Sequence, residues 1–518
     1  MNGAHSLLKT LTANDVTTCF ANPGTSEMHF VAGLDEVPQM RGILCLFEGV
    51  ATGAADGYAR VTAGPAATLL HLGPGLANGW ANLHNARRAR VPLVNIVGDH
   101  ATYHAKFDAW LQSDIAPLAS SLKGWQRSTQ SPDEIARDVA DAVSAAYGPP
   151  GQIATLILPA NVSWGEVTTE THPWPRATRA RLTAPDERLI GQSLQLLRTK
   201  RTALFVGGAA VNKEQLALAQ RVVQATGGRL IMETFPAIMD RGMGVVSPER
   251  LVYLSEFAIA QLQDLDALIL IGSTEPVGFF AYPDVESQLV AQGCQVVNLA
   301  PPGCDTWATL AALAEGLEAP PVVAATGERP NAPRGELTTQ SLATAVAATI
   351  PEDLIIADES NTGGMHLYGA SSFSAPHRLM TLTGGSIGYG LPAALGAAVG
   401  SGQRVLALEA DGSMMYTLQA LWTMARESLD VTVVGLSNRS YAILNFERQR
   451  VGAVTDGLAS QRMLELDNPT IDLCALASAQ GVPSTRVTRA DELVTALERS
   501  YNTPGPMFIE AVLPKGLS

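Results

Sequence analysis

The feature that most constrains the fold is a series of short, unbroken apolar runs, each followed by a turn-forming cluster and a longer helical stretch. Strands with apolar residues at successive positions are buried on both faces, which is typical of parallel sheets covered by helices. Because the runs fall into three groups, the sequence predicts an α/β protein with three doubly wound parallel-sheet domains. The runs lie at 17–24, 42–49, 66–75, 91–99 and 153–160, then at 203–208, 229–233, 266–273 and 294–300, and finally at 353–360, 404–413, 430–438 and 506–513.

Two stretches without such runs separate the three groups. The polar segment 171–187 and the Pro-, Ala- and Gly-rich segment 318–337 have the composition of linkers. The length agrees, since 518 residues correspond to about three domains of ~150 residues each. The predicted domains are 1–170, 188–318 and 338–518.

Composition excludes several classes of protein. Lys and Arg number 35 against 49 Asp and Glu, which gives a net charge of −14 and argues against binding to nucleic-acid phosphates. No apolar run reaches the ~18 residues of a membrane span, and the N-terminal segment lacks the apolar stretch of a secretory signal. The five cysteines form no CxxC pair, which is typical of a reducing compartment. We therefore expect a cytoplasmic protein that contacts neither nucleic acid nor a membrane.

Oxygen-bearing side chains follow two successive strands of the predicted third domain. Asp411 and Gly412 follow the run at 404–408, and Asn438 ends the next run 27 residues later. The carboxyl ends of parallel strands can be neighbours, so both side chains and the Ser440 carbonyl could hold one Mg²⁺, which prefers oxygen ligands. The alternative is that both residues only cap helices. The paired strand ends favour a site for a metal and a phosphate group.

These motifs resemble the metal-binding motif of the thiamine-diphosphate-dependent 2-oxo-acid decarboxylases and acetolactate synthases. The resemblance extends over nearly the whole chain, in the order pyrimidine-binding, middle and diphosphate-binding domain. It implies that Asp411, Asn438 and the Ser440 carbonyl bind Mg²⁺, and that the ion binds the diphosphate of thiamine diphosphate. Arg439 stands where a small or polar residue is usual, and its contacts are left open.

Glu48 resembles the activating glutamate of the same family. It lies in the segment 46–60, between an apolar run and a helix rich in Gly and Ala. The resemblance implies that its carboxyl group hydrogen-bonds the aminopyrimidine ring and so activates the cofactor. Alternatively, an exposed glutamate can stabilise a helix start through the helix dipole. The apolar run before it and the small residues after it favour a partly buried position.

A glycine-rich loop at 383–396 resembles the loop that presses against the cofactor in this family. Ile387 matches the bulky apolar residue that wedges under the two rings. The alternative is an ordinary glycine loop before a core helix. The other cofactor contacts that the resemblance implies are Asn361, Thr362, Gly385, Gly412, Ser413 and Tyr441.

Two residues after strands of the first domain are candidates for contact with a 2-oxo-acid substrate. The segments that hold Thr25 and His71 resemble benzoylformate decarboxylases more than acetolactate synthases, which implies that His71 binds the substrate carboxylate or transfers protons. Considered alone, His71 is equally typical of a core histidine. Phe280 stands where the decarboxylases have a second histidine. Ile443 and Leu444 are expected on the substrate side.

Which residue transfers protons in place of this second histidine stays open. His100 and His104 could supply it or could be surface loop residues. The middle domain also lacks the Arg- and Asp-rich segment with which acetolactate synthases hold FAD, since 273–280 reads STEPVGFF. We therefore expect no FAD.

Three functions are compatible with these motifs. The first is a thiamine-diphosphate lyase or transferase that decarboxylates a 2-oxo acid, and the sequence does not separate aldehyde release from carboligation. The second is an idle regulatory or assembly subunit, which would be expected to have lost Glu48 or Asp411. The third, a nicotinamide dehydrogenase, is compatible with the fold alone and ranks last, because no strand of the first domain is followed by GxGxxG. The resemblance also implies a homodimer or homotetramer in which Glu48 of one chain faces Asp411 of its neighbour.

Overall fold

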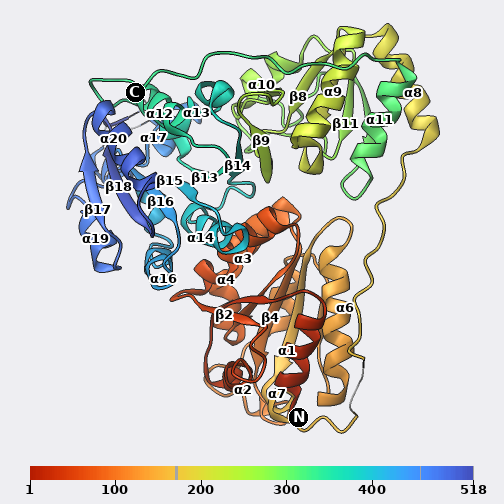
Figure 1. Ribbon diagram of the computed structural model, residues 1–518, viewed down its shortest axis with the longest axis vertical. Coiled ribbons are helices and arrows are strands. Elements are labelled where there is room, and N and C mark those ends of the chain that lie inside the picture. The colour runs from red at the N-terminus through yellow and green to blue at the C-terminus, as the bar shows by residue number, and fades with distance from the viewer. Residues whose placement is uncertain (170–172, 455–456, 517–518) are drawn as a thin grey trace.

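The computed structural model consists of three α/β lobes that follow one another along the chain (Figure 1). It describes residues 1–169, 173–454 and 457–516. The predicted domain limits at 170 and 518 and the start of the first linker at 171 lie outside the described residues. The sheets confirm the prediction of an α/β fold with three parallel-sheet domains, whereas the exact domain boundaries stay a prediction.

The first lobe is built on a six-stranded sheet in which all strands are parallel. In spatial order the strands are β2 (Arg41–Leu44), β1 (Thr18–Asn22), β3 (Ala66–Leu70), β4 (Leu93–Asp99), β6 (Ile153–Pro159) and β5 (Gln126–Ser128). The helices are α1 (Gly3–Ala13), α2 (Met28–Gly33), α3 (Glu48–Thr62), α4 (Leu72–Ala89), α5 (Ile115–Ser120), α6 (Ile135–Tyr147) and α7 (Ala160–Trp164).

The middle lobe has a five-stranded parallel sheet. Its strands, in spatial order, are β10 (Glu249–Arg250), β8 (Arg229–Met232), β7 (Thr202–Val206), β11 (Ala267–Ile271) and β12 (Gln295–Ala300). Its helices are α8 (Glu187–Thr199), α9 (Lys213–Thr226), α10 (Ser255–Leu262) and α11 (Thr306–Gly316). Residues 173–186 run along the right-hand side of Figure 1 toward the start of α8.

The third lobe has a seven-stranded sheet with one antiparallel edge strand. In spatial order the strands are β17 (Ser484–Val487), β18 (Met507–Val512), β16 (Val431–Ser437), β15 (Val405–Ala410), β13 (Leu354–Glu359), β14 (His377–Thr381) and β9 (Ile238–Arg241). The helices are α12 (Thr339–Thr349), α13 (Leu367–Ala370), α14 (Gly390–Ser401), α15 (Asp411–Met414), α16 (Ala420–Arg426), α17 (Ala442–Arg450), α18 (Leu458–Arg462), α19 (Leu473–Ala479) and α20 (Ala490–Tyr501). Strand β9 belongs to the predicted middle domain by sequence, yet it pairs with β14.

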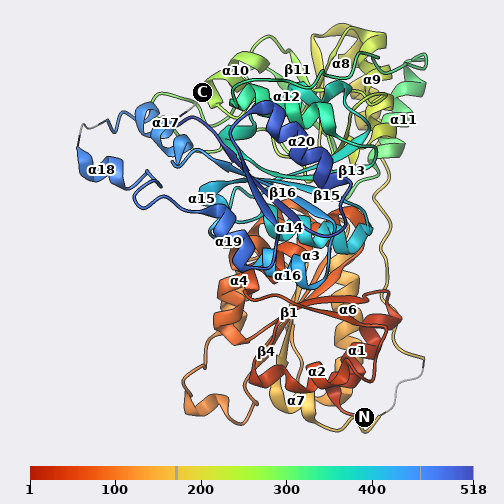
Figure 2. The same cartoon turned by 60° about the vertical axis from the view of Figure 1, so that its left-hand side comes forward.

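Alternate residues of the same strands enter different hydrophobic cores, which explains the unbroken apolar runs. In β3, Ala67 and Leu69 pack with α1 and α6, whereas Ala66 and Leu70 pack with α3 and α4. In β13, Ile355 belongs to the core that contains α3, and neighbouring residues belong to a core shared with the middle lobe. The third sheet therefore packs against both other lobes, and Figure 2 shows it between them.

Helices α3 and α14 form the junction between the first and third lobes. A Cβ built on Gly57 would lie 2.1 Å from the carbonyl oxygen of Ala393, and one built on Gly396 would lie 1.8 Å from that of Ala54. Only glycine permits so close an approach of the two backbones. The small residues after Glu48 therefore dock the start of α3 beside the loop that precedes α14.

Within the described residues, no helix combines the length and the apolar character that crossing a bilayer requires.

Candidate active site

Glu48 is the first residue of α3 and is 7% exposed. The Asn78 side-chain amide donates to its Oε2 at 3.1 Å, and a Cβ built on Gly75 would lie 3.2 Å from its Oε1. The predicted partly buried position is therefore confirmed, while its role toward a cofactor stays a prediction. The surrounding segments fix the carboxyl group in one orientation.

Asn82 joins the start of α3 to the glycine loop of the third lobe. Its side-chain amide donates to the carbonyl oxygens of Gly49 at 2.8 Å and Gly388 at 2.9 Å. Within one chain, the turn that carries Glu48 and the loop that carries Ile387 are thus bridged by a single buried side chain.

His71 lies between β3 and α4, and its partner could not be predicted from the sequence. Glu27 is fully buried, and its Oε2 lies 2.8 Å from His71 Nδ1. The Gly24 amide and the Ser26 hydroxyl donate to the same carboxylate at 2.7 and 2.6 Å. A Cβ built on Gly98 would lie 1.6 Å from Glu27 Oε1, so β4 closes the other side. This enclosure holds the carboxylate against His71 Nδ1, which orients the imidazole.

The hydroxyl beside His71 belongs to Ser26. Its Oγ is 3.3 Å from His71 Nδ1, whereas Thr25 is an exposed residue at the start of the same short 3₁₀ helix. The sequence signal for Glu27 was an acidic residue three positions after Gly24, where its carboxylate accepts the Gly24 N–H. That spacing does not reveal the long-range contact with His71.

The two other candidate histidines, His100 and His104, pack on each other after β4. The rings of His100 and His104 are 5.4 Å apart, and His104 also contacts Phe107 at 5.8 Å. Phe107 is 66% exposed. The pair forms part of a loop with exposed aromatic side chains, and its role stays open.

The structure brings the proposed metal ligands to one edge of the third sheet. Strands β15 and β16 pair in parallel, with Ala410 beside Leu436, so that Asp411 and Asn438 follow neighbouring strands. The Gly412 amide donates to Asp411 Oδ1 at 2.8 Å, and the Arg439 amide donates to Asp411 Oδ2 at 2.6 Å. The adjacency predicted from the spacing of 27 residues is therefore present.

Arg439 shapes this loop through its backbone. Its φ of 58° lies in the left-handed region, which turns its N–H toward Asp411. Its guanidinium donates to the Leu513 carbonyl at 3.1 Å, and Asn438 Oδ1 accepts the Ser440 N–H at 3.0 Å. The arginine thus ties the loop with the proposed metal ligands to the C-terminal segment.

The other predicted diphosphate contacts also gather at this edge. Asn361 begins a short turn after β13, and its side-chain amide donates to Ser413 Oγ at 3.0 Å. Thr362 is the next residue of that turn. The Tyr441 ring packs against the backbone of Gly412, since a Cβ built there would lie 2.5 Å from the ring. The ends of β13, β15 and β16 therefore present polar groups together.

The donor set at this edge suits a hard cation that also binds a phosphate group. Among the described residues, no group of three or more His, Cys, Asp or Glu side chains could hold a metal alone. One carboxylate, one amide oxygen and a backbone carbonyl leave coordination positions for diphosphate oxygens and water, which suits Mg²⁺. Burial raises the pKa of Asp411 to about 6. A cation would offset the desolvation cost that causes this shift.

The glycine loop before α14 is held by a second unpredicted glutamate. Glu359, at the end of β13, accepts the N–H groups of Gly388, Tyr389 and Gly390 at 2.7, 2.6 and 2.6 Å. Burial raises its pKa to about 7. Burial and the adjacent Glu359 raise the pKa of Glu409 well above its usual range. Glu359 therefore fixes the end of the loop that contains Gly385 and Ile387.

Arg60 joins all three lobes next to the same loop. Its side chain is fully buried and forms an ion pair with Asp56 at 2.8 Å. Its Nη1 donates to the carbonyl oxygens of Ala237 and Thr381, both at 2.8 Å. The guanidinium also stacks over the ring of Tyr389, 4.6 Å from its centroid. This role could not be predicted from the sequence, because Ala237, Thr381 and Tyr389 are distant from Arg60 in the chain.

The other three predicted substrate residues lie in the middle and third lobes. Phe280 is 57% exposed in the middle lobe, and it is the neighbouring Phe279 that packs directly on Gly385. Ile443 and Leu444 lie in the first turn of α17, where Leu444 is 46% exposed.

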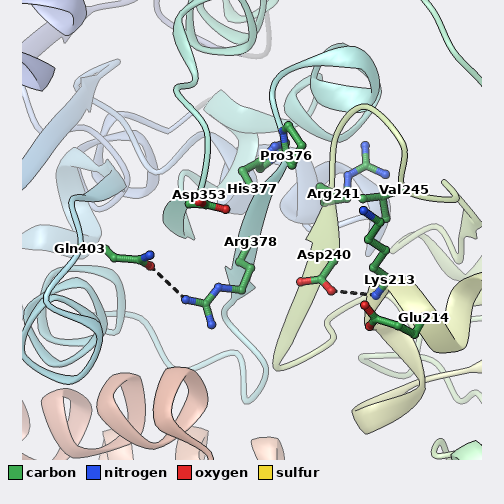
Figure 3. A pocket seen from close by; sticks show the side chains of 10 residues that line it. All are labelled: Lys213, Glu214, Asp240, Arg241, Val245, Asp353, Pro376, His377, Arg378 and Gln403. Carbon is green, nitrogen blue, oxygen red and sulfur yellow. Dashed lines mark hydrogen bonds between the residues drawn. The ribbon is translucent and has the colours of Figure 1, made fainter.

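A separate cavity of about 310 Å³ lies between the middle and third lobes, along the paired strands β9 and β14 (Figure 3). In Figure 3, Asp240 points toward the start of α9 and Arg378 points toward Gln403. No predicted site residue is among the described residues that line it. This cavity is therefore distinct from the candidate active site. The lining residues are Lys213, Glu214, Asp240, Arg241, Val245, Asp353, Pro376, His377, Arg378 and Gln403.

Comparison with known proteins agrees with this geometry. Residues 1–121 match the thiamine pyrophosphate enzyme N-terminal TPP-binding domain, and residues 361–511 match the C-terminal TPP-binding domain. The chain is 51% identical to the acetolactate synthase large subunit-like protein IlvX of Mycobacterium tuberculosis, over 99% of both chains. It is 27% identical to benzoylformate decarboxylase of Pseudomonas aeruginosa, over 96% of both chains. Its fold matches the thiamine diphosphate-dependent 4-hydroxybenzoylformate decarboxylase of Rhodococcus jostii RHA1 with a TM-score of 0.83 and 22% identity, over 100% of both chains.

Proposed function

Because the chain belongs to the thiamine pyrophosphate enzyme family, we propose that it uses thiamine diphosphate and Mg²⁺ to decarboxylate a 2-oxo acid and then releases an aldehyde or joins the acyl unit to a second carbonyl. When bound, thiamine diphosphate supplies the carbon nucleophile and the electron sink that decarboxylation requires. The observation that carries the proposal is the buried Glu48 at one half-site together with the oxygen donors around Asp411 at the other.

The residues of the third lobe bind and orient the cofactor in this proposal. Asp411, Asn438 and the Ser440 carbonyl hold Mg²⁺, while Asn361 and Ser413 donate hydrogen bonds to the diphosphate. The loop with Ile387 presses against the cofactor rings, and Glu359 keeps this loop in place through its three backbone hydrogen bonds. Thr362, Gly385, Gly412 and Tyr441 complete the contacts.

The residues of the first lobe move protons. Glu48 shares a proton with the aminopyrimidine ring, and its burial strengthens that hydrogen bond. Glu27 holds His71 through Nδ1, so that Nε2 of the imidazole can reach the substrate carboxylate or a carbonyl oxygen. Ser26 and Thr25 supply hydroxyl groups next to His71.

The test is a screen of 2-oxo acids with thiamine diphosphate and Mg²⁺ that records both CO₂ and acyloin. Aldehyde without acyloin identifies a decarboxylase, and acyloin identifies a carboligase. Absence of CO₂ from every acid, with the cofactor bound, would contradict the proposal.

An idle regulatory subunit is the alternative, and the presence of Glu48 and Asp411 in buried positions disfavours it. The five free cysteines support a reducing, cytoplasmic location.

The middle lobe is expected to bind no flavin, so the purified protein should be colourless. In α/β sheets, nucleotides bind beyond the carboxyl ends of the strands. Here a Cβ built on Gly272 would lie 2.3 Å from the Gly207 carbonyl oxygen, and Glu233 accepts the Gly208 N–H at 2.9 Å. The loops after β7 and β11 therefore pack on each other and on a carboxylate. A flavin band near ~450 nm that co-purifies with the protein would contradict this expectation.

We also propose that the protein works as a homodimer or a pair of dimers with sites between subunits. Apolar side chains beside both half-sites are exposed in the single chain. Leu46, two residues before Glu48, is 45% exposed, and Met28, next to Glu27, is 44% exposed. Met415 and Tyr416, after Asp411, are 38% and 54% exposed. Exposed apolar surface of this kind is typical of subunit contacts.

Mixing two inactive variants tests this arrangement. Glu48→Gln and Asp411→Ala chains, each inactive alone, should regain activity when mixed, because a mixed dimer has one site with both wild-type residues. Random exchange gives about a quarter of wild-type activity, since about half of the dimers are mixed and each has one intact site. Chains with different tags would show whether subunits exchange. Exchange without recovery of activity would mean that Glu48 and Asp411 of the same chain form the site.

A further inference from the structure

Four aromatic side chains of the middle lobe gather beside the glycine loop, and we call them the aromatic wall. Phe279 is central, with ring centroids 5.9 Å from Phe235, 5.4 Å from Tyr253 and 5.0 Å from Phe280. The contacts with Phe235 and Phe280 are edge-on, at interplanar angles of 72° and 71°. Such tilted arrangements are the favoured packing of aromatic rings.

The aromatic wall touches the loop that the proposed function assigns to the cofactor. A Cβ built on Gly385 would lie 2.4 Å from Cζ of Phe279 and 3.3 and 3.4 Å from its Cε atoms. The ring therefore covers Gly385 at van der Waals distance. Ile387 is two residues further along the same loop.

The aromatic wall also has a free apolar face. Phe279 is 42% exposed and Phe280 is 57% exposed. Tyr253 stays neutral, because burial and the nearby Tyr282 and Glu447 raise the pKa of its hydroxyl. The face beside the cofactor loop is thus uncharged and large enough to contact a ring.

The charged residues next to the aromatic wall compensate one another. Arg450 lies 3.1 Å from Glu447 on α17 and 2.5 Å from Glu256 on α10. The same guanidinium stacks over the ring of Tyr282 at 3.9 Å. The charge of Glu447 is therefore neutralised by Arg450, and the same arginine ties α17 to the middle lobe through Glu256.

We propose that the aromatic wall makes this protein select 2-oxo acids with an aryl or similarly large, flat side chain over small ones such as pyruvate; this inference rests on the proposed function. A ring on the substrate can pack edge-on against Phe279 and Phe280, as these rings do on each other. A methyl group is too small to fill the same space.

The experiment compares kcat/KM for a phenyl-bearing 2-oxo acid and for pyruvate. In the wild type, the phenyl substrate should be preferred by more than about 10-fold, the scale of a hydrophobic pocket contact. Phe280→Ala should lower kcat/KM for the phenyl substrate about 10- to 100-fold and leave pyruvate within about 3-fold. Phe280→Leu should show a partial loss. Phe257→Ala is the matched control, because Phe257 is 61% exposed on α10 and outside the wall.

Three results would overturn the proposal. The first is a preference of the wild type for pyruvate. The second is an equal loss of kcat/KM for both substrates in Phe280→Ala without a change in oligomeric mass. The third is such an equal loss together with a change in oligomeric mass. In the last case the wall would be a subunit contact. Two measurements distinguish these results from a failure of the proposed function. They are calorimetric binding of thiamine diphosphate and release of CO₂ from any 2-oxo acid. If CO₂ is formed only from small acids, the proposed function stands and the aromatic wall does not set specificity.

Discussion

Replacing Asp411 by alanine is expected to abolish binding of thiamine diphosphate in the presence of Mg²⁺, with an affinity loss of more than about 100-fold. The variant removes the one carboxylate of the proposed metal site and the acceptor of two backbone N–H groups. The fold should survive, because the raised pKa of Asp411 shows that burying its charge is unfavourable without a cation. Isothermal titration calorimetry measures the affinity, and circular dichroism checks the fold.

Two further variants separate charge from shape. Asp411→Asn keeps a hydrogen-bond acceptor and removes the charge, so it should lose nearly as much affinity as alanine. Asp430→Ala is the control, since Asp430 precedes β16 at the opposite end of the sheet and should leave binding unchanged. In the wild type, binding should weaken as the pH falls below about 6, because a proton then competes with Mg²⁺ for Asp411. Unchanged affinity for thiamine diphosphate in Asp411→Ala would contradict the proposal that Asp411 binds Mg²⁺.

Glu48→Gln is expected to lower turnover by about 10²–10⁴-fold, the usual effect of losing an acid or base. Glutamine has the same shape and can keep the contact with Asn78, but it cannot share a proton with the aminopyrimidine ring. Cofactor binding should therefore persist while the cofactor is not activated. Proton exchange at C2 of the bound cofactor, followed by NMR in D₂O, measures this step directly.

The matched control for this variant is Glu36→Gln. Glu36 is a surface residue of the same lobe, with a side chain that is 69% exposed. Its replacement should change neither turnover nor exchange. An exchange rate at C2 in Glu48→Gln equal to that of the wild type would show that this carboxyl group is not the activator.

Most strands that carry the candidate site could be predicted from the sequence, because their apolar runs are unbroken. The strands that were missed are short or interrupted by polar residues. Strand β14 contains His377 and Arg378, and β9 contains Asp240 and Arg241. Strand β9 is the edge strand of the third sheet, where one side of the ladder is open and apolar residues need not continue. Strand β14 pairs with β13 on one side and with β9 on the other.

Some of the individual site residues could be predicted from the sequence, and others could not. Glu48, Asp411 and Asn438 could be found because each follows an apolar run, and strand ends of a parallel sheet share one edge. Glu27 could not be assigned, because its partner His71 is 44 residues away. The choice between Phe279 and Phe280 also depends on which ring the chain turns toward Gly385, and neighbouring residues look alike in a sequence.

The sequence alone therefore determined the α/β class, the order of the three lobes and the polar residues that end their strands, since these depend on local apolar patterns and chain direction. Only the tertiary structure decided what supports those residues. Glu359 holds the glycine loop, Arg60 joins three lobes and β9 crosses into a sheet of another lobe. The physical reason is that hydrogen bonds and packing between distant segments depend on how helices and sheets dock. Docking in turn depends on close approaches such as that of Gly57 to Ala393, which leave no periodic pattern in the chain.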